Sequence, residues 1–136
     1  MELVDFLRAR LDEDEAAARA VPADLGHSWS DPGPWVMAGS GGGGREAEVA
    51  KAADALEMPL AEAVAHHIAR HDPARVLAEV EAKRRIVDLT AGMLSAAKGD
   101  SEVDHYGGLS AAEDTLRLLA RPFRDHPDFD PSWLED

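Results

Sequence analysis

Residues 72–97, DPARVLAEVEAKRRIVDLTAGMLSAA, carry the strongest local signal in the chain. Aspartate is a favoured N-cap and proline suits the first helical position, so Asp72-Pro73 predicts a helix start. Apolar residues then recur at three- and four-residue steps to about Ala97, interrupted by the basic run 83–85. We therefore expect a long helix that forms the spine of the fold, with an apolar stripe of Val76, Leu77, Val80, Val87, Ala91 and Leu94.

Three segments that precede this helix also show helical spacing of apolar residues. Residues 2–20 form the first segment, and Pro22 prevents the helix from continuing. The Ala-rich residues 46–57 form the second, and Pro59 separates them from a short helix over residues 60–70. That short helix carries one apolar face, made of Leu60, Val64 and Ile68.

The C-terminal part of the chain predicts one more helix and a tail. Residues 110–113, SAAE, form a capping box, and Pro122 ends the helix that it starts. The tail, 122–136, is too apolar for a free acidic extension. We expect it to lie extended across the helices, with the rings of Phe123, Phe129 and Trp133 in grooves.

Residues 22–45 form an irregular connection that is rich in proline and glycine. Its Asp-Pro-Gly-Pro-Trp turn is rigid, so Trp35 is expected to be largely buried. Residues 36–38 suggest a very short strand at most. The run Gly39–Gly44 formally satisfies the G-x-G-x-x-G dinucleotide pattern, but that pattern requires a strand–turn–helix–strand setting that the sequence does not predict.

These elements predict a mostly α-helical single domain over residues 1–136. We expect a small bundle of four to five helices with a Pro/Gly-rich turn, at most one short β-hairpin and an extended aromatic tail. A chain of 136 residues with 45% hydrophobic side chains is long enough for one core. Without cysteine, it has neither a disulfide framework nor a thiol nucleophile.

The net charge of −13 limits the partners that the chain can take. A surface this negative argues against direct binding to nucleic acid or to an anionic membrane. No stretch of about 18 apolar residues is present, and Met1-Glu2 opens on an acidic segment, so neither a membrane span nor a signal peptide is expected. The expected location is the cytoplasm.

Four separated blocks resemble an uncharacterised family of small acidic proteins that is common in high-GC bacteria and their phages. The blocks are DFLRARLDEDEAAARA at 5–20, PGPW at 32–35, HIARHDPARVLAEVEAKRR at 67–85 and RPFRDHPDFDPSW at 121–133. The PGPW turn and the later helix start at Asp72-Pro73 also resemble those of Ea22-like phage proteins. The resemblance implies an architecture and a genomic setting but no activity. Relatives place short strands within 36–60, where this chain is Gly-rich and then Ala-rich.

Histidines provide one chemical lead. His67 and His71 are four residues apart and face one direction on a helix, as paired metal ligands do. His126 would be a third ligand, and a carboxylate would complete a site for zinc or another divalent ion. Alternatively, His71 caps the end of the 60–70 helix and no metal binds. The carboxylate candidates are Asp12, Glu13 and Asp72.

The layout of charge provides another lead, because acids gather at both chain ends and residues 70–85 form a positive strip. We expect the acidic first helix to pair with that strip, within the monomer or across a dimer. No Gly-x-Ser-x-Gly elbow or Walker lysine is present. The function predicted is a non-enzymatic intracellular interaction or regulatory module with a protein partner, and a homodimer would help bury Leu3, Leu7 and the long-helix stripe. The alternatives are a divalent-metal protein with possible hydrolase activity and an acidic DNA mimic that inhibits a nucleic-acid-binding protein.

Overall fold

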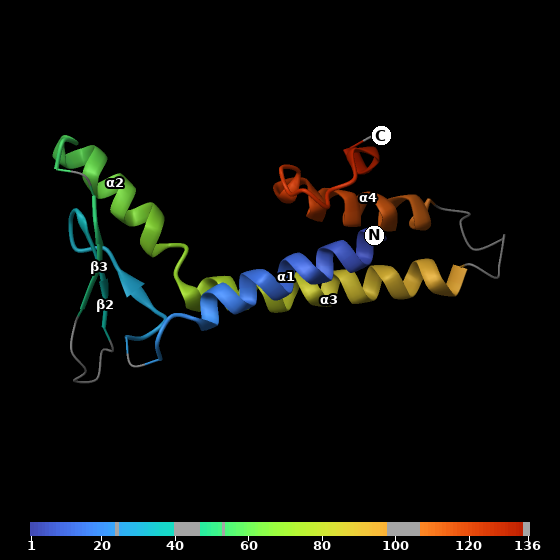
Figure 1. The fold of residues 1–136 in the computed structure, drawn as a ribbon, viewed down its shortest axis with the longest axis horizontal. Helices are drawn as coiled ribbons and strands as arrows, with labels where there is room; N and C mark the ends of the chain where they lie inside the picture. Colours follow the sequence, from blue (N-terminus) through green and yellow to red (C-terminus); the bar gives the residue numbers. More distant parts are fainter. Residues whose placement is uncertain (24, 40–46, 53, 98–106, 135–136) are drawn as a thin grey trace. The chain divides into compact units, whose positions relative to one another are not determined.

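The computed structural model describes residues 1–23, 25–39, 47–52, 54–97 and 107–134, and this part of the chain is mostly helical (Figure 1). It divides into two compact units. The sheet unit is residues 14–79, and the helical unit is residues 1–13 with 80–136. The elements in chain order are α1 (Leu3–Arg19), β1 (Trp29–Ser30), β2 (Trp35–Ala38), β3 (Ala47–Lys51), α2 (Met58–Ala69), α3 (Pro73–Ala97), α4 (Gly108–Ala120) and the 3₁₀ turns η1 (Arg121–Phe123) and η2 (Pro131–Leu134).

The start of α3 confirms the strongest sequence prediction. The backbone N–H of Arg75 donates to Oδ1 of Asp72 at 2.8 Å, which is the expected N-cap bond. The second carboxylate oxygen of Asp72 accepts the backbone N–H of Trp29 at 3.0 Å. One side chain therefore caps α3 and also holds the start of β1.

The sheet unit contains more strand than the sequence predicted. Strands β1, β2 and β3 form an antiparallel sheet in that order, in which Val36 pairs with Ala50 and Ala38 with Ala47. The expectation of at most one hairpin is therefore wrong, as is the helix predicted over 46–57. Alanine favours a helix by local propensity, but pairing with β2 satisfies the β3 backbone and overrides that preference.

The inner face of α2 is made of small side chains. Ala61, Ala65 and Ala69 are buried, and Ala65 and Ala69 pack in one cluster with Val36 of β2. Small residues let a helix approach a sheet closely, and α2 lies along the sheet in Figure 1. The apolar face expected from the sequence is only partly buried: Ile68 packs on the cluster, whereas Leu60 and Val64 are exposed.

Trp35 is 39% exposed, so the prediction of a largely buried ring is wrong. The residue begins β2, where alternate side chains point to opposite faces, and Val36 and Ala38 take the buried positions. The outward ring lies under Lys51, whose ammonium nitrogen is 5.9 Å from the ring centroid. The next described element after β2 is the antiparallel β3, whereas the dinucleotide pattern requires a helix after its strand. Residues 40–44 of that pattern lie outside the described residues.

The core of the helical unit contains large apolar residues from α1, α3 and α4. Leu7, which a second copy was expected to cover, is 1% exposed within the unit, because it packs there with its own chain. Helix α4 starts at Gly108, before the predicted capping box, because Gly107 supplies a left-handed turn at φ 71°. The tail forms η1 and η2 and is not extended. Other buried members of this unit are Phe6, Leu11, Val80, Val87, Ala112, Leu116 and Ala120.

Candidate functional site

Phe6 of α1 is the centre of an aromatic cluster in the helical unit. Its ring is fully buried, with ring centroids of Trp133 at 4.9 Å, Phe129 at 5.8 Å and Phe123 at 6.3 Å. The turn η2 that carries Trp133 is fixed by Asp130, whose Oδ1 accepts the backbone N–H of Ser132 at 2.9 Å. That bond favours the charged carboxylate and lowers the pKa of Asp130. The tail rings thus pack on α1, as predicted, but the tail is not extended, because Phe123 and Trp133 lie in 3₁₀ turns.

Arg10 is buried beside this cluster, with 6% of its surface exposed. Its guanidinium carbon lies 5.2 Å from the Phe6 ring centroid, and Nη2 donates to Oε1 of Glu13 at 2.8 Å. Nη1 contacts both ring nitrogens of His126, and the N–H of Asp128 donates to His126 Nδ1 at 3.1 Å. His126 is therefore engaged by the packing of the tail, where it helps hold the tail on α1.

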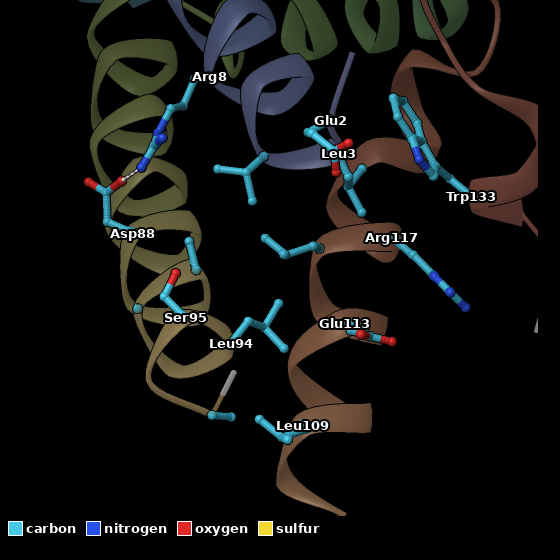
Figure 2. Close-up of a pocket in the computed structure, with 15 residues that line it drawn as sticks. Glu2, Leu3, Arg8, Asp88, Leu94, Ser95, Leu109, Glu113, Arg117 and Trp133 are labelled. Carbon is cyan, nitrogen blue, oxygen red and sulfur yellow. Dashed lines mark hydrogen bonds and ion pairs between the residues drawn. The ribbon is translucent and has the colours of Figure 1, made fainter. Parts of the chain in front are cut away.

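A hollow of about 1010 Å³ lies between the N-terminal end of α1, the C-terminal half of α3 and α4. Figure 2 shows Leu3, Leu94 and Leu109 directed into it, while Glu113 and Arg117 point outward from α4. Arg8 donates to Oδ1 of Asp88 at 2.8 Å at its rim, and this carboxylate raises the pKa of Arg8. The lining combines apolar side chains with charged ones, as ligand-binding sites commonly do.

The exposed side of α3 carries a second apolar stripe that the sequence analysis missed. Leu89 is 64% exposed, Met93 53% and Ile86 40%, and Ala82 and Ala96 are exposed on the same side. Monomeric proteins expose single apolar residues freely, but an ordered row is typical of an interaction surface. The signal was present in the sequence as a second helical repeat, offset from the buried one. We call residues 82, 86, 89, 93 and 96 the outer stripe.

The three histidines proposed as metal ligands divide between the two units. His67 and His71 lie together at the end of α2, with ring centroids 4.6 Å apart, whereas His126 belongs to the helical unit. His71 Nδ1 lies 2.7 Å from the His67 carbonyl oxygen and donates to it, which is the capping contact expected at a helix C-terminus. Among the described residues, no three His, Asp or Glu side chains gather as a metal site.

The predicted pairing of the first helix with the long helix is present within the helical unit. Arg84 of α3 bonds Asp12 of α1. The Arg8–Asp88 bond joins the same helices with the signs reversed. Because water reaches these side chains and screens the charges, the two pairs serve mainly to align the helices. The DNA-mimic alternative depends on net charge alone and stays a prediction.

The fold and its surfaces define a small acidic α-rich protein with a three-stranded sheet and an apolar helix face on its exterior. The chain belongs to a family of unknown function (DUF6221), whose model matches residues 1–135. No curated protein and no solved structure matches the chain. Among the described residues, no helix has the length and apolar character needed to cross a membrane.

Proposed function

We propose that the protein is a non-enzymatic interaction module that binds a protein partner through the outer stripe of α3. The observation that carries this proposal is that α3 has two apolar faces, one buried and one exposed. One face is buried against the rest of the helical unit, through residues such as Val80 and Val87. The other exposes Ile86, Leu89 and Met93 in one row. An apolar face on the outside of a helix is stabilised when a partner removes it from water.

The setting of this module follows from the resemblance and from the charge. We propose a cytoplasmic protein of bacterial or phage origin, as the four matching sequence blocks imply. The net charge of −13 keeps a chain with an exposed apolar face dispersed and disfavours nucleic acid as the partner. The part of the partner that meets the outer stripe is therefore expected to carry positive charge beside its apolar residues.

Photo-crosslinking tests the proposal directly. A photoreactive amino acid at position 89 should give an adduct of discrete mass in the cells that make the protein. A Met93→Glu change in the same chain should remove that adduct, because it places a charge in the outer stripe. Leu60, which is 57% exposed on α2, provides the matched control position in the sheet unit. No protein adduct at position 89, or an adduct that is indifferent to Met93→Glu, contradicts the proposal.

A divalent-metal site at the end of α2 is the second candidate function, favoured by the geometry of His71. Its Nδ1 donates to a backbone carbonyl, an outer-shell bond typical of metal-binding histidines, and this leaves Nε2 as the lone-pair nitrogen. The neighbouring His67 ring supplies a second nitrogen at helical i, i+4 spacing. Zinc or a similar ion would take the two histidines and complete its coordination shell with water or another protein group.

Titration calorimetry with zinc and with nickel tests this candidate. We expect binding of one ion per chain in the wild type and at least a tenfold weaker affinity in His67→Ala, because one of two imidazoles is lost. His66→Ala is the control, because His66 contacts Asp31 at 2.9 Å and is not part of the pair. Equal binding by wild type and His67→Ala would rule out the pair as the site. His126→Asn tests the three-histidine set predicted from the sequence, because an unchanged zinc affinity would exclude His126 as a ligand.

A further inference from the structure

We propose that two copies of the chain associate with each other, with their α3 helices packed antiparallel along the outer stripe. This inference rests on the proposed function and names its partner. The stripe residues Ala82, Ile86, Leu89, Met93 and Ala96 belong to the helical unit alone and are exposed or half-exposed in the single chain.

The spacing of the outer stripe is the first argument for a second helix as occupant. Its members follow steps of four, three, four and three residues, which is the heptad alternation of positions a and d. Such a row of knobs fits the holes of a helix with the same spacing. The second copy presents that spacing on an identical exposed face, and a two-fold contact of one surface with itself is the commonest oligomer interface.

The sizes of the side chains favour an antiparallel pair. When Ile86 is placed level with Leu89 of the second copy, Met93 comes level with Ala82 of that copy, and the large residue meets a small one. By the two-fold symmetry, Leu89 of the first copy lies level with Ile86 of the second, and Ala82 of the first lies level with Met93 of the second. Gly92, at the edge of the stripe next to the hollow, has no side chain and no atom within 4 Å of where a Cβ would be, so it adds no bulk against a second helix.

Charge complementarity supports the same alignment. Arg85 lies on one flank of the stripe, and Asp88 follows on the same side one turn later. In the antiparallel pair, Arg85 is offset by about 3 Å along the axis from Asp88 of the second copy, given the 1.5 Å rise per residue. Two symmetric ion pairs result. A parallel pair would place Arg85 near Thr90 of the second copy, where it gains no acidic partner.

Disulfide trapping tests the arrangement cleanly, because the chain has no cysteine of its own. Two single variants, Ile86→Cys and Leu89→Cys, are made with tags of different mass and mixed under mild oxidation. The antiparallel alignment brings these two positions level, so the mixed disulfide should exceed either symmetric disulfide. Dominant symmetric disulfides would overturn the antiparallel arrangement. A lack of any disulfide, together with monomeric mass by sedimentation at every attainable concentration, would overturn self-association.

A charge exchange measures the role of the flank. Arg85→Asp and Asp88→Arg alone should each weaken the dimer severalfold, and the double variant should restore the affinity. Arg8 also bonds Asp88, so Arg8→Gln is the control for loss of that bond within one chain and should not weaken the dimer. Failure of the double variant to recover contradicts the proposed ion pairs. Circular dichroism of each variant confirms that the helices are intact.

The two proposals fail in different ways. A discrete adduct at position 89 to a protein other than this chain, with a monomer in sedimentation, overturns the homodimer and leaves the interaction module standing. Absence of both the adduct and the dimer removes both proposals.

Discussion

The two units of this chain build their cores from different side chains. The helical unit buries large residues, with Phe6 fully buried at the centre of three further aromatic rings. The sheet unit buries alanines against one valine, and it leaves its larger residues Leu60 and Met58 outside. Stability from burial scales with the apolar area removed from water, so the sheet unit depends more on backbone pairing and close approach. Changes of side-chain size should therefore have opposite consequences in the two units.

The largest effect is expected from removing the central ring of the helical unit. Phe6→Ala leaves a cavity under Phe129 and Trp133 and should lower the free energy of unfolding by about 3–5 kcal/mol. Leu60→Ala in the sheet unit removes an exposed side chain and should change it by less than about 0.5 kcal/mol. Urea denaturation followed by circular dichroism measures both. An equal decrease in the free energy of unfolding for Phe6→Ala and Leu60→Ala would show that the aromatic cluster does not dominate the core.

Enlargement should damage the sheet unit instead. Ala65 is fully buried on the inner face of α2, so Ala65→Leu overpacks the contact with Val36 and should cost about 1–3 kcal/mol. Ala63→Leu on the exposed side of the same helix is the matched control, with nearly the same change in helix propensity. Hydrogen exchange of the β2 amides reports the loosening. Unchanged exchange in Ala65→Leu would mean that α2 does not lie closely on the sheet.

The contact made by Asp72 should have an intermediate effect. Asp72→Ala removes the cap of α3 and the bond to the Trp29 amide, and it should lower the free energy of unfolding by about 1–2 kcal/mol. Asp72→Asn keeps an oxygen for capping and should recover most of this loss. Thermal unfolding monitored by the tryptophan fluorescence compares the two variants. Equal melting curves for wild type and Asp72→Ala would contradict the dual role.

The smallest expected effect is a pH dependence in the tail. The amide of Ser132 stabilises the charged form of Asp130, so its pKa is lower in the folded chain than in the unfolded one. Its contribution is therefore present above the unfolded pKa and is lost as the pH falls through the folded pKa. An NMR titration of the Ser132 amide should follow this ionisation, and Asp130→Asn should abolish the acid-side change. If the chemical shift of the Ser132 amide does not change as Asp130 ionises, this turn is not sensitive to pH.

The helices were predictable because their signals are local. Asp72-Pro73 sets the start of α3, and α1 covers Leu3–Arg19 where helical spacing predicted residues 2–20. The same local logic failed at β3, because the Ala-rich sequence at 47–51 is a helix former and only its pairing with β2 makes it a strand. The family resemblance placed strands in this region, and the composition argued against them.

The candidate sites were predictable only in part, since they depend on which face of a helix is covered. The spacing of His67 and His71 predicted their proximity, and the structure places the two rings together. The outer stripe was not predicted, because the spacing of Val76 to Leu94 indicated a single apolar face for α3. Leu89 and Met93 were then left unexplained, and no rule of periodicity alone says which of two apolar faces of a helix the chain itself will cover.

The two bonds of Asp72 also bear on the order in which the chain folds. Its bond to Arg75 is local and can form as soon as the first turn of α3 does, whereas its bond to Trp29 spans 43 residues. Closing a loop of that length costs chain entropy before the sheet contributes anything, and such non-local contacts slow folding. We expect α3 to form early with Asp72 already in its capping rotamer, so that the carboxylate offers β1 a fixed docking point and strand assembly becomes the slow step.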